Sequence, residues 1–386
     1  MDNKEKAAAC ALNHIFGYEP KIALRIVQEL GSASAVFDLS PKERNALTGP
    51  YSKYAGSLSD ELLENSSREL EELEEKGCGF LPYSHPAYPK LLKECEDPPA
   101  GIYYKSSSPP DEVFNDAPFI SIVGTRDMSS YGKEWCTKIV EALSYAPQKP
   151  VIVSGLAFGV DITAHSAALH YGLPTIAVLP NGINSVYPSA HRPAARKIAS
   201  SPGCALITDY PPGTGPMAFT FLRRNRIIAG LSRATLLIES KIRGGGLITA
   251  RLASDYGRDV FALPGRIDDI RSQGCNLLLV EKIAEPIVNL ADACRQMGLG
   301  NYNLRKRSDL LEWVGKIYKK IPEDKRSLFL QLVQEIKKQR GITLGELCTK
   351  LGKPYSVLVG MAATLESDGI IDIDLLGRCT INAKNA

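Results

Sequence analysis

The chain has 386 residues, of which 44% are hydrophobic and 23% are charged, so it is globular and long enough for one large core and one or two smaller ones. The net charge of +3 excludes a general polyanion binder of the histone kind, so any nucleic-acid surface must come from local clustering of cations. Such clustering exists, because residues 217–251 carry seven lysines and arginines against one acid, whereas residues 60–75 carry eight acids against one arginine. The middle of the chain is therefore its basic part.

The nine cysteines are scattered between Cys10 and Cys379, with no CxxC pair and no neighbouring histidines to complete a zinc site. We therefore expect reduced thiols, no disulfide framework and no bound metal. No leader segment is recognisable, and no apolar run approaches the roughly 20 residues of a spanning helix. These features predict a cytoplasmic protein that makes no membrane contact.

Residues 4–76 have the pattern of several short helices, which together predict a small helical domain over residues 1–80. In this segment Ser40 is placed to cap a helix whose first residue is Pro41. The proline-rich stretch that follows it predicts a connector packed against the next domain.

Residues 81–295 form the predicted central domain. From about residue 117, short β-branched runs that are apolar throughout alternate with helical patterns. Apolar strands of this kind are buried on both faces, so the pattern predicts a Rossmann-like α/β fold with a doubly wound, mostly parallel sheet.

Residues 296–322 have a basic bias without a strong apolar stripe and are interpreted as a linker. Residues 323–386 read as three helices and two short strands, which is the pattern of a C-terminal winged-helix domain. Thr343 is placed to cap the second of these helices, with Glu346 as its capping-box partner. The third helix contains no lysine or arginine, so this domain is expected to contact a protein rather than a DNA groove.

Glycine-containing turns follow three of the predicted strands, at the edge of the sheet where open α/β folds bind their ligands. The turns are Gly124 to Arg126, Ser154 to Gly159 and Arg243 to Gly246, and each precedes a predicted helix. Glycine lets backbone amides approach an oxyanion and a helix start adds partial positive charge, so three converging turns favour phosphate binding over three unrelated tight turns. No GxGxxG or GxxxxGK[ST] motif is present, so we expect no nucleotide cofactor.

The stretch FTFLRRNRIIAG places Arg223, Arg224 and Arg226 directly after two phenylalanines. An arginine beside an aromatic ring can hold a phosphate while the ring stacks on a base, which is how single-stranded nucleic acid is held with little sequence preference. The alternative is that Phe219 and Phe221 belong to the core and that the arginines form a solvated face. These residues alone leave both interpretations open.

Asp161 and His165 lie four residues apart on a predicted helix and could form an acid/base pair. A capping aspartate and a hydrogen-bonded core histidine are the preferred interpretation, because both residue types serve these structural roles more often.

Six motifs resemble, in order and spacing, those of the DNA-processing protein A (DprA/Smf) family. They are IVGTRDMSSYG, VSGLAFGVDITAHSAALHYG, AVLPNGINSVYP, FLRRNRIIAGLS, GGGLITARLASDYGRDVFALPG and QGCNLL. The resemblance is close over residues 85–290. The flanking segments match the family's layout, which has a small helical domain of the SAM or helix-hairpin-helix type before the central domain and a winged helix after it.

The resemblance implies a protein that is not an enzyme and that binds single-stranded DNA, forms a homodimer and loads the RecA recombinase during natural transformation or homologous recombination. The DNA-binding residues that it implies are Gly124, Arg126, Ser154, Gly155, Phe221, Arg224, Asn225, Arg226, Lys241, Arg243 and Gly245. Among these, Arg126 would hold one phosphate, Ser154 and Gly155 would donate hydrogen bonds to another, and Phe221 would stack on a base. In the same resemblance Arg224 and Arg226 close the basic pocket, with Asn225 positioning them.

This chain departs from the family pattern at three places. Met217 replaces a lysine that usually precedes the aromatic stretch, so we expect either a weaker affinity for DNA or a replacement of that cation by Lys241 or Arg243. Gly244–Gly246 replaces a Ser-Gly-Ser sequence, which removes two hydroxyl donors and keeps the backbone amides. Leu222 replaces a proline, a change expected to alter the stiffness of a loop.

The alternative function is that of an enzyme of the nucleoside-monophosphate phosphoribohydrolase type, which shares a Rossmann-like fold and a glycine-rich phosphate loop. Those enzymes have a glutamate in the motif PGGxGTxxE. The corresponding stretch here, RGGGLITAR, ends in Arg251, and a cation cannot replace that carboxylate. Binding without catalysis is therefore the preferred interpretation.

Overall fold

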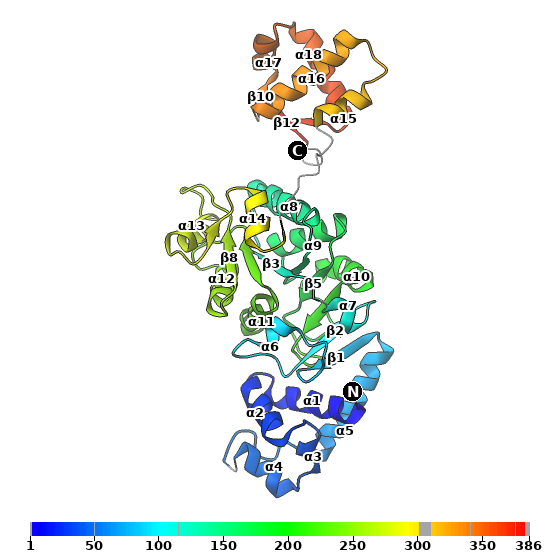
Figure 1. Cartoon of the computed structure of the whole chain (residues 1–386), viewed down its shortest axis with the longest axis vertical. Coiled ribbons are helices and arrows are strands. Elements are labelled where there is room, and N and C mark those ends of the chain that lie inside the picture. Colours follow the sequence, from blue (N-terminus) through cyan, green and yellow to red (C-terminus); the bar gives the residue numbers. More distant parts are fainter. Residues whose placement is uncertain are drawn as a thin grey trace. The chain divides into compact units, whose positions relative to one another are not determined.

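The structure, a computed structural model, describes residues 2–49, 51–114, 116–300, 310–339, 341–374 and 376–382. The chain divides into two compact units, Met1–Asn303 and Leu304–Ala386 (Figure 1). Within the described residues, no helix has both the length and the apolar composition that crossing a bilayer demands.

The first unit begins with helices α1 (Asn3–Phe16), α2 (Pro20–Leu30), α3 (Ala35–Asp38), α4 (Pro41–Thr48) and α5 (Asp60–Glu75). The predicted cap of α4 is confirmed, because the Ser40 hydroxyl accepts a hydrogen bond from the Glu43 amide while the Glu43 carboxylate accepts one from the Ser40 amide. Proline at the first position of α4 needs no hydrogen-bond acceptor for its nitrogen, which fixes where this helix begins.

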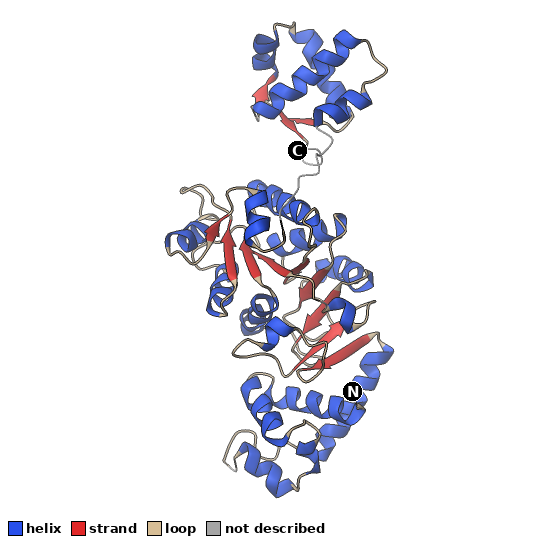
Figure 2. Ribbon diagram, viewed as in Figure 1, coloured by secondary structure: helices blue, strands red, loops and turns tan. Residues whose placement is uncertain are grey.

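The centre of the first unit is a nine-stranded sheet with the order β1-β2-β6-β5-β4-β3-β7-β8-β9 (Figure 2). Its strands are β1 (Cys78–Pro82), β2 (Gly101–Lys105), β3 (Phe119–Val123), β4 (Val151–Ser154), β5 (Thr175–Val178), β6 (Ala205–Thr208), β7 (Ala234–Leu237), β8 (Asp259–Ala262) and β9 (Glu285–Pro286). Strands β3 to β9 pair in parallel, and β1 and β2 add an antiparallel edge beside β6. The prediction of a mostly parallel α/β sheet is confirmed.

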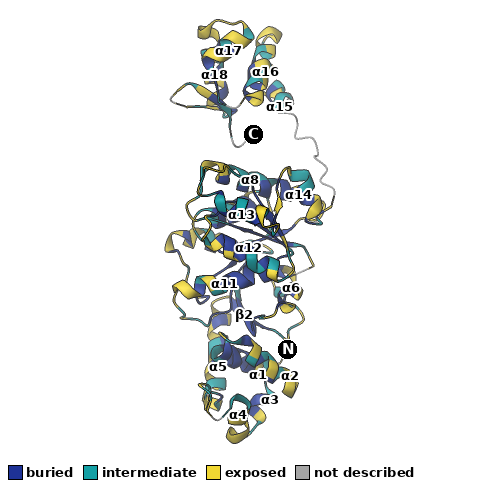
Figure 3. Cartoon of the chain, turned by 90° about the vertical axis from the view of Figure 1, so that its left-hand side faces the viewer, coloured by how far each residue is buried: buried dark blue, intermediate teal, exposed yellow. Residues whose placement is uncertain are grey.

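Helices cover both faces of this sheet. They are α6 (Lys90–Lys93), α7 (Pro110–Val113), α8 (Ser130–Ser144), α9 (Val160–His170), α10 (Arg192–Ser200), α11 (Ala218–Leu231), α12 (Gly245–Asp255), α13 (Gln273–Val280) and α14 (Leu290–Gln296), with a short 3₁₀ turn at Ser189–His191. Alternate residues of β3 separate the two faces, since Ile120 and Ile122 pack with α8 and α9, whereas Phe119 and Val123 pack with α11 and α12. Buried residues accordingly line the strands and the inner sides of these helices (Figure 3).

The N-terminal helices share a core with the edge of the sheet. Leu12 and Phe16 of α1 are fully buried in the same apolar cluster as Tyr103 of β2 and Leu206 of β6. The domain boundary expected at residue 80 falls inside β1, which is a strand of the sheet.

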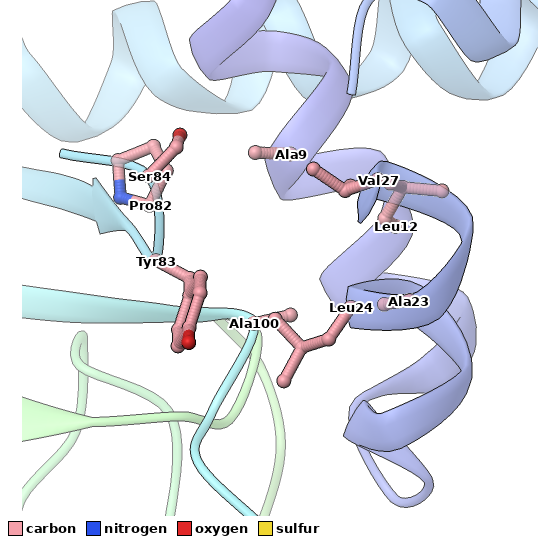
Figure 4. A pocket seen from close by; sticks show the side chains of 9 residues that line it. All are labelled: Ala9, Leu12, Ala23, Leu24, Val27, Pro82, Tyr83, Ser84 and Ala100. Carbon is pink, nitrogen blue, oxygen red and sulfur yellow. The ribbon is translucent and has the colours of Figure 1, made fainter. Parts of the chain in front are cut away.

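A small cavity of about 20 Å³ lies between α1, α2 and the segments that flank β1 and β2 (Figure 4). Its lining is mostly apolar and consists of Ala9, Leu12, Ala23, Leu24, Val27, Pro82, Tyr83, Ser84 and Ala100. A volume near that of a single water molecule marks it as a packing gap between the helices and the sheet edge rather than a ligand site.

The second unit contains α15 (Leu310–Ile317), α16 (Glu323–Lys338), α17 (Leu344–Leu351) and α18 (Tyr355–Ser367), together with a sheet of order β10-β12-β11. The strands of this sheet are β10 (Ile342–Thr343), β11 (Ile371–Ile373) and β12 (Arg378–Ile381). The predicted capping box at the start of α17 is confirmed, because Thr343 and Glu346 exchange side-chain and backbone hydrogen bonds.

The interpretation of residues 296–322 as a linker is wrong for residues 310–317, which form α15. Val314 is fully buried in the core of the second unit, and Tyr318 stacks on Phe329 of α16 with 4.3 Å between ring centroids. The apolar stripe of this helix is short, so the surrounding basic residues concealed it in the sequence. The part of the expected linker at 301–309 lies outside the described residues.

Candidate nucleic-acid interface

Strands β3 and β7 are neighbours in the sheet, and the connections that leave their carboxyl ends lead to helices on opposite faces. Such a place is called the topological switch point of the sheet, and open α/β folds bind their ligands there. Gly124, directly after β3, is required there because a Cβ atom would lie 2.6 Å from Val160 Cγ2 and 2.8 Å from the Glu239 carbonyl oxygen. A Cβ on Gly246 would lie 2.8 Å from the Gly124 Cα atom, so the start of α12 packs directly against the turn after β3.

The N-terminus of α8, which carries partial positive charge and follows the Gly124–Arg126 turn, already holds a carboxylate of the protein itself. Glu239 follows β7 and is 1% exposed, and its carboxylate accepts hydrogen bonds from the Ser129 amide at 2.9 Å and from the Ser129 hydroxyl. The Thr125 amide donates to the Glu239 carbonyl oxygen at 2.7 Å. A carboxylate at a helix N-terminus neutralises the partial charge that an external anion would use. The phosphate cradle predicted at Gly124 to Arg126 therefore retains the Arg126 side chain but not the helix start.

The expected donors after β4 are also engaged internally. The Ser154 hydroxyl is buried and donates to the Ile122 carbonyl oxygen at 2.6 Å, and the Gly155 amide donates to Asp161 Oδ2 at 3.2 Å. The Ala157 amide donates to the same Asp161 oxygen at 3.4 Å. Asp161 therefore joins the turn after β4 to the first turn of α9, and the expectation that it caps this helix is wrong, because the N-cap residue is Gly159. Burial raises the pKa of the Asp161 carboxyl. We therefore correct the assignment of Ser154 and Gly155 as phosphate donors.

His165 has the structural role that the sequence favoured. It is fully buried, and its Nδ1 atom lies 2.7 Å from Thr175 Oγ1. Burial lowers the pKa of the imidazole to about 3, so this side chain is neutral throughout the physiological range.

The stretch that contains the three arginines forms α11, so Leu222 lies on a helix, and the expectation that it alters the stiffness of a loop is wrong. Arg224 is 3% exposed and donates to the Val178 carbonyl oxygen at 2.5 Å. Its guanidinium fills the space where Gly155 lacks a side chain. Burial lowers the pKa of Arg224 to about 10, against the opposing attraction of Asp161. Arg224 thus supports the turn after β4 from inside the protein.

Arg226 is held in an internal ion pair, with Asp209 Oδ2 2.6 Å from its Nη2 atom and Asp97 Oδ2 3.7 Å from its Nη1 atom. Arg223 donates to the carbonyl oxygens of Gly17 and Tyr18 at the end of α1. The expectation that Arg226 closes a solvent-facing basic pocket is therefore wrong, because its charge is neutralised inside the protein.

Asn225 is 8% exposed and belongs to the buried part of α11. Its side chain is therefore expected to act within the protein rather than on a ligand.

Arg126 and Phe221 do lie together at the surface. The Arg126 guanidinium carbon is 4.9 Å from the centroid of the Phe221 ring, and among the described residues Arg126 has no ion pair. The ring of Tyr187 packs edge-on against Phe221, with 5.4 Å between centroids and 73° between planes. Tyr187 is 43% exposed and extends the aromatic surface. No role was predicted for Tyr187, although it lies within the motif AVLPNGINSVYP.

The start of α12 is the second exposed feature. Its N-cap residue is Gly244, which has no side chain to accept hydrogen bonds from the first-turn amides. Lys241, Arg243 and Gly245 around it are exposed, and within the described part of the chain neither cation has an ion pair. We call Arg126, Tyr187 and Phe221, together with the segment 241–246, the carboxyl rim.

The fold and this rim define a doubly wound α/β protein with exposed cations and rings at its switch point. The chain belongs to the DNA recombination-mediator protein A (DprA/Smf) family, whose pattern matches residues 79–298, as the six motifs predicted. It is 35% identical to "Protein Smf" of Synechocystis over 294 residues, which is 75% of this chain and 72% of that protein. It is 40% identical to "DNA processing protein DprA" of Streptococcus pneumoniae over 194 residues, covering 50% of this chain and 66% of the other.

The X-ray structure of DNA processing protein A from Streptococcus pneumoniae has the same fold, with a TM-score of 0.60 and 30% sequence identity. The match covers 77% of this chain and 98% of that chain.

Proposed function

We propose that this protein binds single-stranded DNA along the carboxyl rim. The observation that carries the proposal is a surface cluster in which the exposed Arg126 lies over the partly buried ring of Phe221 and the exposed Tyr187 packs against the same ring. A guanidinium beside an aromatic ring can hold a phosphate while the ring receives a base, and this pairing suits a strand whose bases are unpaired.

The strand would continue over the start of α12. The first-turn amides after Gly244 and the cations Lys241 and Arg243 all suit phosphate groups. These groups and the ring faces contact features that every nucleotide shares, so the protein would bind with little base preference.

Family membership supports a recombination-mediator role. Within it we propose that the protein acts in the cytoplasm as a homodimer, protects incoming single strands and loads RecA on them during natural transformation or homologous recombination. A homodimer would place two carboxyl rims on one DNA strand. Binding at the first rim would then raise the effective concentration of the DNA at the second.

The buried carboxylates near the carboxyl ends of the strands do not favour the enzymatic alternative. Glu239 and Asp161 accept hydrogen bonds from backbone amides near the starts of α8 and α9. Arg251, which stands where a phosphoribohydrolase has its glutamate, pairs with Glu281 at 2.6 Å. Free base should not appear when the protein is incubated with nucleoside monophosphates.

The decisive experiment measures binding of a fluorescent mixed-sequence oligonucleotide by anisotropy, once as a single strand and once as a duplex. We expect the single strand to bind more tightly and different sequences to bind alike. Equal binding of the duplex would overturn the proposed use of unpaired bases. Light scattering with and without the oligonucleotide tests the homodimer separately.

A further inference from the structure

A cluster of possible metal ligands lies in the N-terminal helices, outside the carboxyl rim. Cys10 and His14 are one helical turn apart on α1, so their side chains lie on the same face. Glu69 of α5 faces them, with its Oε1 atom 3.5 Å from Cys10 Sγ and 3.0 Å from His14 Nε2. Thiol, imidazole and carboxylate are the three ligand types that zinc prefers in proteins.

The expectation of no metal site overlooked Cys10 and His14, which are only four residues apart. The third ligand, Glu69, is 55 residues from His14, and only the pairing of α1 with α5 brings it to them. The distances suit a tetrahedral ion. Bond lengths typical of zinc place sulfur and oxygen ligands about 3.6 Å apart and nitrogen and oxygen ligands about 3.4 Å apart. The observed separations differ from these by a few tenths of an ångström, and all three ligand atoms lie within 4.8 Å of one another.

The hydroxyl of Tyr103 lies beside two of the three proposed ligands. Tyr103 of β2 is fully buried, and its hydroxyl donates to Glu69 Oε1 at 3.0 Å and lies 3.2 Å from Cys10 Sγ. Hydrogen bonds of this kind orient metal ligands and tune their basicity. Among the described residues Glu69 has no lysine or arginine partner, although it lies on the acidic helix α5. A divalent cation would balance the charges of the Glu69 carboxylate and a Cys10 thiolate.

The cluster is accessible from one side. The side chains of His14 and Glu69 are 27% and 22% exposed, whereas Cys10 is fully buried. His14 also lines a cavity of about 400 Å³ that Tyr18 and Asp209 border. This side leaves room for an ion to arrive and for water to complete its coordination.

We propose that Cys10, His14 and Glu69 bind one divalent transition-metal ion of the zinc type, with water as a fourth ligand. The ion joins α1 to α5 and, through Tyr103, connects both helices to the sheet. The site is independent of the DNA-binding function proposed above.

Binding replaces a proton by the metal. The Cys10 S–H bond breaks, its electron pair forms the metal–sulfur bond, and the proton leaves to solvent. His14 gives up to solvent the Nε2 proton of its hydrogen bond with Glu69 and donates the freed lone pair to the metal, and the neutral imidazole carries its proton on Nδ1, taken from solvent where that nitrogen was bare. Each ion bound at Cys10 therefore releases a proton.

The test uses the full chain, freed of metal with a chelator and titrated with Co²⁺. We expect saturation at one Co²⁺ ion per chain and a near-ultraviolet absorption band from sulfur-to-cobalt charge transfer. Adding Zn²⁺ should displace the Co²⁺ and remove the band. Cys10→Ser should abolish the band, and His14→Gln should weaken binding while preserving the circular dichroism spectrum, because His14 is partly exposed. Tyr103→Phe should lower the affinity by roughly 10- to 100-fold.

Cys348→Ser is the matched control, because it removes a free thiol from α17 in the other unit and should leave the titration unchanged. A parent protein that shows no charge-transfer band, or a band that persists in Cys10→Ser, would mean that the three side chains form a hydrogen-bonded network and not a metal site.

Discussion

Arg126→Ala separates the electrostatic part of the proposed DNA binding from protein stability. The Arg126 side chain is exposed, and among the described residues it contacts the face of Phe221 and repels the buried charge of Arg224. Removing it leaves no buried charge, and the lost contact with the ring is worth about 0.5–1 kcal/mol at an exposed site. The variant should therefore fold normally and bind DNA less tightly.

The magnitude follows from counterion release. Each phosphate contact contributes a slope of about −0.7 to log K against log salt for a single strand, so one lost contact reduces the slope by that amount. If the variant and the parent bind equally near about 1 M salt, the affinity of the variant is about fourfold lower than that of the parent at about 0.15 M and about eightfold lower at about 0.05 M.

The assay is anisotropy of a labelled mixed-sequence single strand over a series of salt concentrations. Lys42→Ala is the matched control, because it also removes one exposed positive charge, from α4, and Lys42, like Arg126, has no ion pair among the described residues. It should leave the slope almost unchanged. An Arg126→Ala slope equal to that of the parent would refute the phosphate contact, and equal losses in both variants would show that only net charge matters.

Three further predictions concern the rings, the buried ion pair and the buried histidine. Phe221→Ala should cost about 1–3 kcal/mol of DNA binding with an unchanged salt slope, because stacking releases few counterions, and Phe219→Ala should cost less in the same assay. Asp209→Asn leaves Arg226 with only the more distant Asp97, so urea denaturation should show a loss of about 3–5 kcal/mol, and a loss below about 1 kcal/mol would contradict the buried pair. Burial holds the pKa of His165 at about 3, below 6.5, so the unfolded chain takes up a proton that the folded chain does not as the pH falls through this window. Stability should fall by up to about 1.4 kcal/mol per pH unit there, and His165→Asn should flatten that dependence in denaturation curves at several pH values.

Local patterns in the sequence predicted much of the fold. Apolar β-branched runs alternating with helical segments are typical of a parallel sheet covered on both faces, and the strands formed where these runs lie. The caps at Ser40 and Thr343 were also predictable, because a capping box involves residues only three positions apart. Helix α15 was missed because its short apolar stripe lies among basic residues.

The carboxyl rim was only partly predictable. Strand ends indicate which turns reach the switch point, and in the structure Arg126 and Arg243 of these turns are exposed. Sequence position could not show that Glu239 neutralises the start of α8 or that Asp161 takes the amide of Gly155. Glu239 is 110 residues from Ser129 and meets the start of α8 only in the folded chain, whereas Asp161 is six residues from Gly155 and meets its amide through the shape of the turn after β4.

The sequence by itself determined the order of strands and helices and the concentration of cations in the middle of the chain, because these depend on residue type and periodicity. Only the tertiary structure decided which cations remain available. Arg226 meets Asp209, 17 residues away, and Asp97, 129 residues away, whereas Arg126 meets an aromatic ring and solvent. Whether a guanidinium can hold an external phosphate depends on whether a distant carboxylate has already reached it, and that is a property of the packed chain.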